Sequence, residues 1–155
     1  MTTQIIEIVK YPNEILRQKS TPISAKDEDF KDVMDKLNFA KEYVSNNENQ
    51  AAGLALPQIG VLKRGFVATL GGKTEIVINP KILKKSGIDY DTEGCLSIEE
   101  EILGEVPRPK SIMVQYVNDS MKVRVKTLTG WDARVFCHEL DHLNGVLFFD
   151  HIKED

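Results

Sequence analysis

The 155-residue chain lacks the residue types that mark several large classes of protein. It has only two cysteines, too few for a disulfide scaffold. We therefore expect a reducing, cytoplasmic setting, where a lone cysteine more often serves catalysis or metal binding. No run approaches about 18 apolar residues, so we expect no membrane-spanning helix. The amino-terminal residues also lack the basic and apolar regions of a secretory signal.

An excess of positive charge is missing as well. The net charge is −4, from 20 Lys and Arg against 24 Asp and Glu. Such a chain offers no basic field for a phosphate backbone, and we expect no direct nucleic-acid binding. Apolar residues make up 41% and charged residues 28%, an ordinary globular balance. No repeat, low-complexity tract or long linker divides the chain, which predicts a single domain over residues 1–155.

The clearest local pattern predicts a helix over Ala25–Val44. Ser24 and Asp27 fit a capping box at its start, and apolar residues behind them mostly recur at helical spacing. Two strands, Phe66–Leu70 and Glu75–Ile78, flank a Gly-Gly pair, which is typical of a hairpin. We expect Pro80 to limit the second strand, because proline cannot donate to a strand ladder.

A second strand pair is predicted at Ser111–Val117 and Met121–Leu128. In the latter, apolar and basic residues alternate, which predicts one buried face and one solvated face. The apolar set is Met121, Val123 and Val125, and the basic set is Lys122, Arg124 and Lys126. A last helix is predicted over Trp131–Leu143, with Gly145 as its stop. Helix, strands and helix in separate blocks indicate an α+β fold.

This last helix carries an H-E-x-x-H sequence. His138 and His142 lie one turn apart on the same face, so both imidazoles can reach one metal ion. Glu139 is placed to accept a proton from a metal-activated water. The alternative, a helix with two incidental surface histidines, is less favoured because the chain has only three histidines in all.

A catalytic metal needs a third protein ligand. The extended metalloprotease motif would put a histidine where Phe148 stands, and His151 comes three residues too late. The other common arrangement uses a glutamate well downstream, where only Glu154 is found. The third ligand is therefore expected upstream of the helix.

Cys95 is the leading candidate for that ligand. It lies in an E-G-C-L-S turn, where glycine lets backbone and thiolate approach an ion closely. The alternative is a small buried hydrophobe, the usual fate of a lone cysteine. Cys137 is a poorer candidate, since it points about 100° away from His138 on the helix, and we interpret it as packing.

A third segment, Gly53–Gly60, is dense in glycine, proline and small residues and predicts a fixed loop. Gln58 offers an amide N–H that could point into a site. The alternative is a tight connection between the first helix and the sheet.

In this order, the three segments resemble the signatures of peptide deformylase, approximately G-x-G-x-A-A-P-Q-x-G, E-G-C-L-S and Q-H-E-x-D-H-L-x-G. The chain has A-A-G-L-A-L-P-Q-I-G over 51–60, E-G-C-L-S over 93–97 and C-H-E-L-D-H-L-N-G over 137–145. Residues 11–17 and 78–80 also match, so the resemblance covers about Val9 to Phe149. It implies mixed antiparallel sheets around a central C-terminal helix, with an N-terminal helix.

The resemblance implies an enzyme that removes the formyl group from N-terminal formyl-methionine and releases formate. Cys95, His138 and His142 would hold one divalent metal per chain. In the family this is usually Fe(II), while Zn, Ni or Co occupy the same ligands. Residue chemistry alone would favour Zn, because a thiolate and two imidazoles suit it.

The implied mechanism assigns roles to further residues. Hydroxide attacks the formyl carbon, while Glu139 takes the proton of the water and later passes it to the leaving amine. The side-chain amide of Gln58 and the backbone N–H of Leu96 stabilise the oxyanion. Backbone groups near Gly53 and Gly94 pair with the substrate as an added strand.

Five positions depart from the family pattern. Leu56 replaces a small alanine, Ala51 the first glycine, Cys137 a glutamine and Glu99 a proline. Arg134 lies where relatives tend to be apolar, near the methionine pocket, and could instead extend to solvent.

Formyl-methionyl nascent peptides are the implied partners, and a monomer is expected. Many relatives continue into another helix, linked in some to ribosome docking. Here only residues 143–155 follow the last motif histidine, so ribosome association is doubtful, and the compact form resembles phage-type members.

Two other functions compete with this one. A metal-dependent peptidase would keep H-E-x-x-H, but its downstream ligand is missing. A silent protein that binds N-termini or a structural metal would have no use for Glu139, because a structural site closes its fourth position with protein.

Overall fold

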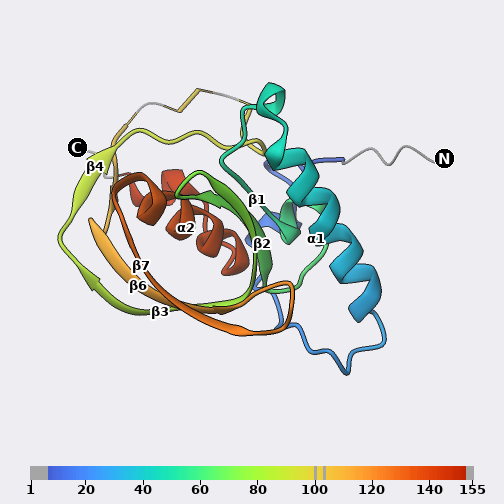
Figure 1. Ribbon diagram of the computed structural model, residues 1–155. Coiled ribbons are helices and arrows are strands. Elements are labelled where there is room, and N and C mark those ends of the chain that lie inside the picture. Colours follow the sequence, from blue (N-terminus) through green and yellow to red (C-terminus); the bar gives the residue numbers. More distant parts are fainter. Residues whose placement is uncertain (1–6, 100, 103, 153–155) are drawn as a thin grey trace.

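A curved antiparallel sheet wraps around helix α2, and helix α1 packs against the opposite face of the sheet (Figure 1). This computed structural model describes residues 7–99, 101–102 and 104–152. The helices are α1 (Phe30–Ser45) and α2 (Gly130–Leu143). The sheet has the order β1-β2-β3-β6-β7, with β1 (Gly53–Ala55), β2 (Gly65–Leu70), β3 (Lys73–Ser86), β6 (Ser111–Val117) and β7 (Val123–Thr129). A separate pair joins β4 (Asp89–Asp91) to β5 (Val106–Arg108). The expected α+β arrangement around a C-terminal helix is confirmed.

The two helices create two hydrophobic cores, one on each face of the sheet. Strand β2 contributes to both, which explains its uninterrupted apolar sequence. Phe66 and Ala68 pack in the core under α2, together with Phe136 of that helix. Val67 points the other way and packs with Leu37 of α1. A strand buried on both faces gives α2 a rigid support.

Helix α1 starts at Phe30, five residues later than the capping pattern predicted. The capping contacts themselves form, because Ser24 N–H donates to Asp27 Oδ2 at 3.0 Å and Lys26 N–H donates to Ser24 Oγ at 3.2 Å. They close a turn ahead of the helix instead of its first turn. The predicted start is therefore wrong, while the helix that follows is confirmed.

Pro80 does not end the second hairpin strand. Strand β3 continues through it to Ser86, and the pairing with β6 shifts register between Ile78 and Lys81. Asn79, just before the proline, has φ of 50°. The irregularity falls where proline cannot donate a hydrogen bond, so the strand bends instead of stopping.

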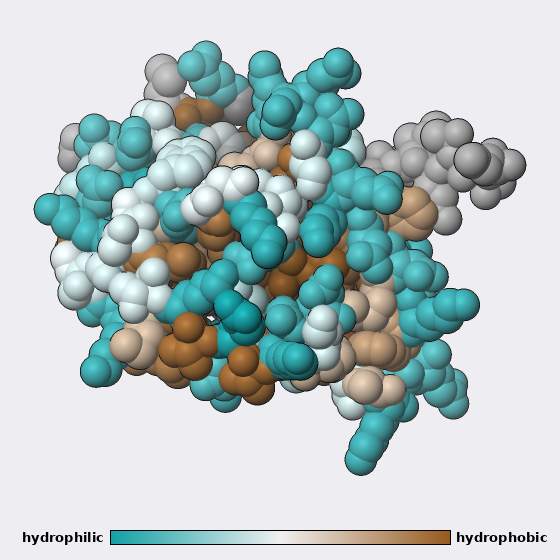
Figure 2. Space-filling model, in the orientation of Figure 1, coloured by the Kyte–Doolittle hydropathy of each residue, from teal (hydrophilic) through white to brown (hydrophobic). Residues whose placement is uncertain are grey.

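Strand β7 lacks the buried apolar face that was predicted, while Lys122 and Arg124 are exposed as expected. Val123 and Val125 are 63% and 56% exposed, and Met121 is also exposed. Lys126 pairs with Val114, whose side chain packs in the core under α2. The basic residues of β7 therefore point to the side of the sheet that α2 covers. The valines therefore lie on the side turned away from α2, where they are exposed. Figure 2 shows apolar side chains among hydrophilic ones along the lower edge of the face in view. The basic residues still avoid full burial, and Lys126 Nζ donates to Glu75.

Helix α2 follows its predicted range to within one residue. Gly145 has φ of 72°, a conformation that favours glycine, as expected of the stop signal. A Cβ there would also collide with the backbone carbonyl of Arg17. This helix end is thus fixed against the amino-terminal part of the chain.

The amino-terminal segment connects the two loops of the predicted site. Val9 N–H donates to the carbonyl oxygen of Gln58 at 2.6 Å, and Tyr11 N–H donates to that of Ser97 at 2.9 Å. Lys10 Nζ donates to the carbonyl oxygen of Leu96 at 2.7 Å. These bonds hold loops that are 37 residues apart in sequence next to one another.

Among the described residues, none of the helices has the length and apolar character needed to cross a membrane.

The orientation of β7 makes a stability prediction. Val125→Thr should change the free energy of unfolding by no more than about 0.5 kcal/mol, because this side chain is mostly exposed. Val114→Thr should cost about 1–3 kcal/mol, since it buries a hydroxyl in a core. Urea unfolding of both variants measures this, and equal losses would contradict the observed faces.

Candidate active site

Cys95, His138 and His142 come together at the centre of the molecule. One side-chain ligand atom from each lies within 4.8 Å of the others, and Cys95 Sγ is 3.4 Å from His142 Nε2. The histidines are on α2, and the cysteine is in the loop between β4 and β5. One thiolate and two imidazoles suit a divalent metal that keeps an open position for substrate. The structure thus places the three predicted ligands where they can share one ion.

The two histidines differ in their environment. Burial lowers the pKa of His142 well below its usual value, so this imidazole stays in the neutral form that binds metals. Burial acts the same way on His138, but hydrogen bonds to Cys95 and Glu93 outweigh it and raise the pKa of His138 to about 10. Metal binding must therefore displace a proton from His138.

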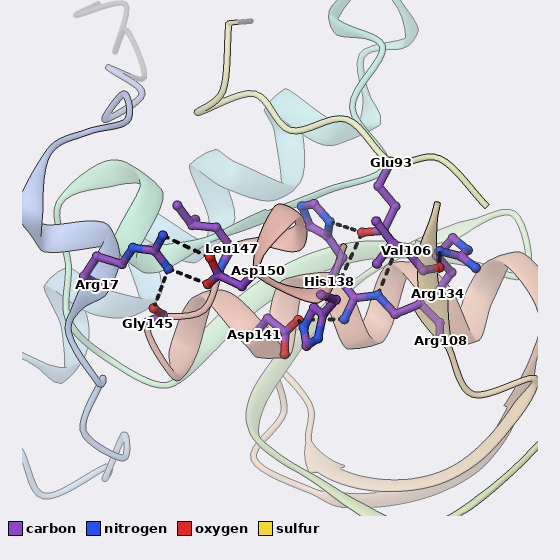
Figure 3. A network of polar contacts seen from close by, with 11 residues as sticks. Arg17, Glu93, Val106, Arg108, Arg134, His138, Asp141, Gly145, Leu147 and Asp150 are labelled. Atoms are coloured by element: carbon purple, nitrogen blue, oxygen red, sulfur yellow. Dashed lines mark hydrogen bonds and ion pairs between the residues drawn. The ribbon is translucent and has the colours of Figure 1, made fainter. Parts of the chain in front are cut away.

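Glu93 fixes the orientation of His138. His138 Nδ1 lies 2.7 Å from Glu93 Oε1, so Nδ1–H is the donor (Figure 3). This leaves Nε2 as the ring nitrogen that can join Cys95 in the ligand cluster. A carboxylate behind a ligand histidine sets its tautomer and makes it a better donor to a metal. Nothing in the sequence pattern indicated this role of Glu93.

Two buried arginines hold the Glu93 carboxylate in place. Arg108 donates through Nε and Nη2 at 2.8 and 3.0 Å, and Arg134 Nη1 donates at 2.7 Å. All three side chains are only 4% exposed. Burial favours the neutral acid, but the hydrogen bonds from Arg108 and His138 prevail and lower the pKa of Glu93 to about 2. The carboxylate therefore stays ionised.

Arg134 is buried and does not extend to solvent, although its long charged side chain had suggested that it could. Besides Glu93, its guanidinium donates to the carbonyl oxygens of Val106 at 2.9 Å and Asp89 at 3.0 Å. These carbonyls belong to β5 and β4, so Arg134 ties the small strand pair to α2. Its charge faces protein groups in the part of the chain that the structure describes.

The same network continues away from the metal ligands. Arg108 Nη1 donates to Asp141 Oδ2 at 2.6 Å, and His151 Nε2 lies 2.8 Å from the same oxygen (Figure 3). His151 therefore pairs with a carboxylate. This placement agrees with the prediction that His151 is not the third metal ligand.

Glu139 is buried beside the ligand cluster. This residue is only 4% exposed, and burial raises the pKa of its carboxyl to about 7. Its Oε1 has no hydrogen-bond partner among the described residues. A buried, unpaired carboxylate oxygen is costly in a structural role and suited to handling a proton.

Gly53 makes room for Glu139. A Cβ on this glycine would lie 2.7 Å from Glu139 Oε2, closer than real Cβ contacts come. The family pattern implied a role only for the backbone of Gly53, so its missing side chain is a second contribution to the site. Gly94, in contrast, has open space where a Cβ would stand, and it lines the cavity beside the site.

Gln58 faces the cysteine loop with a fixed amide. The Ala55 N–H donates to Gln58 Oε1 at 2.9 Å, which leaves the NH2 end to point inward. That end donates to Ser97 Oγ at 3.1 Å and lies 3.5 Å from Cys95 Sγ. The inward N–H predicted for Gln58 is present, and Ser97 is an additional partner that the sequence did not reveal.

A cavity of about 380 Å³ opens onto these groups. Gln58, Leu96, His138 and Glu139 line its inner part, and Trp131 lines it further along α2. Nothing in the sequence pattern had distinguished Trp131 from an ordinary helix residue.

The other departures fit without disturbing the cavity. Leu56 is 1% exposed and packs in the core under α1. Ala51 needs no left-handed backbone, because the positive φ falls on Gln50. Cys137 is 6% exposed, and burial raises the pKa of its thiol to about 11, which confirms packing. Glu99 forms an exposed ion pair with Lys10.

An H-E-x-x-H helix inside an antiparallel sheet, with a cysteine as third candidate ligand, is the arrangement of a metal-dependent hydrolase. The family model described as polypeptide deformylase matches residues 5–155. Peptide deformylase 2 of Clostridium acetobutylicum is 39% identical over 92% of this chain and 91% of the relative. Peptide deformylase 1 of the same organism is 41% identical over 97% and 96%.

Solved structures agree with the sequence relatives. The crystal structure of peptide deformylase from Thermotoga maritima has a TM-score of 0.84 at 36% identity, over 98% of this chain and all of the other. The chain belongs to the peptide deformylase family. It is a metal-dependent hydrolase of the family that removes N-formyl groups from nascent peptides.

The Glu93 network leads to a second prediction. Glu93→Gln should lower the free energy of unfolding by about 3–5 kcal/mol, because buried Arg134 loses its one carboxylate partner among the described residues and Arg108 keeps only Asp141. It should also weaken metal binding roughly 10- to 100-fold through His138. Urea unfolding and chelator competition measure the two effects.

Glu75→Gln is the matched control, since the one cation that Glu75 pairs with among the described residues is the partly exposed Lys126, and its other partner is the neutral hydroxyl of Tyr116. Metal affinity unchanged in Glu93→Gln would contradict the role of Glu93 in orienting His138.

Proposed function

We propose that this chain removes the formyl group from the N-terminal formyl-methionine of new polypeptides and that the cluster around Cys95 is its catalytic centre. The observation that carries the proposal is the meeting of three ligand atoms within 4.8 Å beside a buried carboxylate. Membership of the family supports the reaction class, and the positions of these groups support their individual roles.

Cys95, His138 and His142 would hold one divalent metal ion. We propose Fe(II) as the native metal, with Zn, Ni or Co able to occupy the same ligands. When bound, the ion supplies a Lewis acid that polarises the formyl oxygen and lowers the pKa of a water molecule. The neutral imidazole of His142 and the fixed tautomer of His138 support this ligand set.

Glu139 acts as the general base and then as the general acid. It accepts a proton from the attacking water and delivers it to the amine that leaves. Its unpaired Oε1 is available for this transfer, and Gly53 leaves it the space. Burial raises the pKa of the Glu139 carboxyl to about 7, and a cation held by the ligand cluster would lower this pKa, because positive charge favours the carboxylate.

Gln58 and Leu96 stabilise the charge that develops on the formyl oxygen. The Gln58 amide is oriented by Ala55 before substrate arrives, so no reorganisation is needed during the reaction. The backbone N–H of Leu96 is the second donor. Its peptide is held by Ile98 N–H, which donates to the Cys95 carbonyl oxygen at 3.0 Å, and Lys10 binds the carbonyl of the following peptide.

The substrate peptide adds as a strand to the free edge of β1. Within the described sheet, β1 is an outer strand that pairs with β2, and Gly53 lines the cavity. Gly94 lines the same cavity from the cysteine loop. Backbone pairing with Gly53 and Gly94 recognises any sequence, which suits an enzyme that meets many nascent chains.

Formyl-methionyl nascent peptides are accordingly the proposed partners. The monomeric state, the cytoplasmic setting, the single domain over residues 1–155 and the doubtful ribosome association stay predictions.

The direct test is formate release from formyl-Met-Ala-Ser by protein prepared anaerobically with Fe(II). Wild type should turn over, and Glu139→Gln should lose about 10²- to 10⁴-fold in kcat, because the proton acceptor is gone. Glu42→Gln, an exposed change on α1, is the control and should keep full activity. Full formate release by Glu139→Gln would refute the assigned base and leave the family untouched.

Removing the thiolate tests the ligand set. Cys95→Ala should abolish stoichiometric metal binding, because only two protein ligands remain of the three that a catalytic site needs. Metal content after dialysis, measured by atomic absorption, gives the answer. Cys137→Ala serves as control and should retain one metal ion per chain, whereas wild-type affinity in Cys95→Ala would exclude this cysteine as a ligand.

A further inference from the structure

A second cavity adjoins the active-site cavity. It measures about 450 Å³. The two cavities share four lining residues, which are Gln50, Ala51, Ala52 and Trp131. Trp131 is 59% exposed and is the only tryptophan of the chain. A large exposed aromatic ring between two cavities can contact whatever passes from one to the other.

The proposed substrate would leave the active site in this direction. The formyl end lies at Cys95 and Gln58, beyond the end of β1, while residues 50–52 precede the start of that strand. Trp131 is seven residues, and therefore about 10 Å, from His138 along α2. An extended peptide advances about 3.3 Å per residue, so roughly the third residue of the substrate reaches Trp131.

The second cavity has the chemistry to receive a positive charge. Asp132 is the one charged side chain among the described residues that line it. Its Oδ2 accepts a hydrogen bond from Gly71 N–H at 3.0 Å, which holds the carboxylate at the wall of the cavity. Ser45, Thr69 and Thr74 add hydroxyl groups to the lining. A carboxylate next to an exposed indole favours a lysine or arginine side chain, through ion pairing and a cation–π contact.

We propose that this second cavity is a subsite for a cationic side chain at the third or fourth residue of the formyl-peptide substrate. Asp132 and Trp131 are its specificity-determining residues. The proposal rests on the proposed function, because that function supplies the direction in which the peptide leaves. It adds a preference to a site whose backbone pairing is otherwise indifferent to sequence.

The test compares formyl-Met-Ala-Lys-Ser with formyl-Met-Ala-Glu-Ser. A second pair of peptides carries the lysine or the glutamate at the fourth position instead of the third. Wild-type holoenzyme should prefer lysine over glutamate roughly fivefold or more in kcat/KM. Asp132→Asn keeps an acceptor for Gly71 N–H but removes the charge, so the ratio should fall toward one. Trp131→Leu should reduce the ratio in part. Asp119→Asn removes the same charge from an exposed turn and should leave the ratio as in wild type.

A binding measurement separates this proposal from the proposed function. The single tryptophan reports directly on the subsite, so its fluorescence can follow peptide binding to the zinc-loaded Glu139→Gln variant, whatever its activity. The lysine peptide should bind more tightly than the glutamate peptide and change the emission. Equal dissociation constants, or a ratio unaltered by Asp132→Asn, would overturn the subsite even if formate is released. If the lysine peptide binds more tightly than the glutamate peptide but wild type releases no formate, the proposed function is rejected and the subsite stands.

Discussion

The buried carboxylate of Glu93 is the interaction on which the active-site geometry depends. It accepts hydrogen bonds from Arg108, Arg134 and His138, which lie on β5 and α2. Each of these groups would be expensive to bury alone, and each becomes tolerable only because the others are present. Cys95 follows Glu93 by two residues in the same loop, so fixing this carboxylate also fixes the cysteine relative to the histidines.

A curved sheet makes this arrangement possible. Because the sheet wraps around α2, the polar face of that helix is enclosed together with its apolar face, and Glu139 and His142 are removed from water. Helix α1 supports the sheet from the other side through Leu37 and Val67. The catalytic groups come from three separate parts of the chain, and the amino-terminal segment joins two of these parts, the loops of Gln58 and Ser97.

Local periodicity explains what could be predicted from the sequence. His138 and His142 follow from the helical repeat, and the hairpin strands follow from alternation and glycine pairs, because these depend on neighbours along the chain. Cys95 followed from the missing third ligand and from its glycine-containing turn, and the family resemblance supported it. The Glu93 network was missed, since Arg108 and Arg134 approach Glu93 only in the folded chain. The faces of β7 were wrong because an edge strand takes its burial from the helices that cover it, which its own alternation does not encode.

The unpaired buried groups show how stability and chemistry are linked here. Glu139 Oε1 and His142 Nδ1 have no hydrogen-bond partner among the described residues, and each such atom costs about 1–3 kcal/mol. The same burial raises the pKa of Glu139 to about 7 and keeps His142 neutral, which are the states that a proton carrier and a metal ligand need. A well-paired glutamate would make the fold more stable, but its oxygens would no longer be free to take a proton from water. The charged network around Glu93 and the two cores on the sheet therefore hold in place a site that is itself unfavourable for folding.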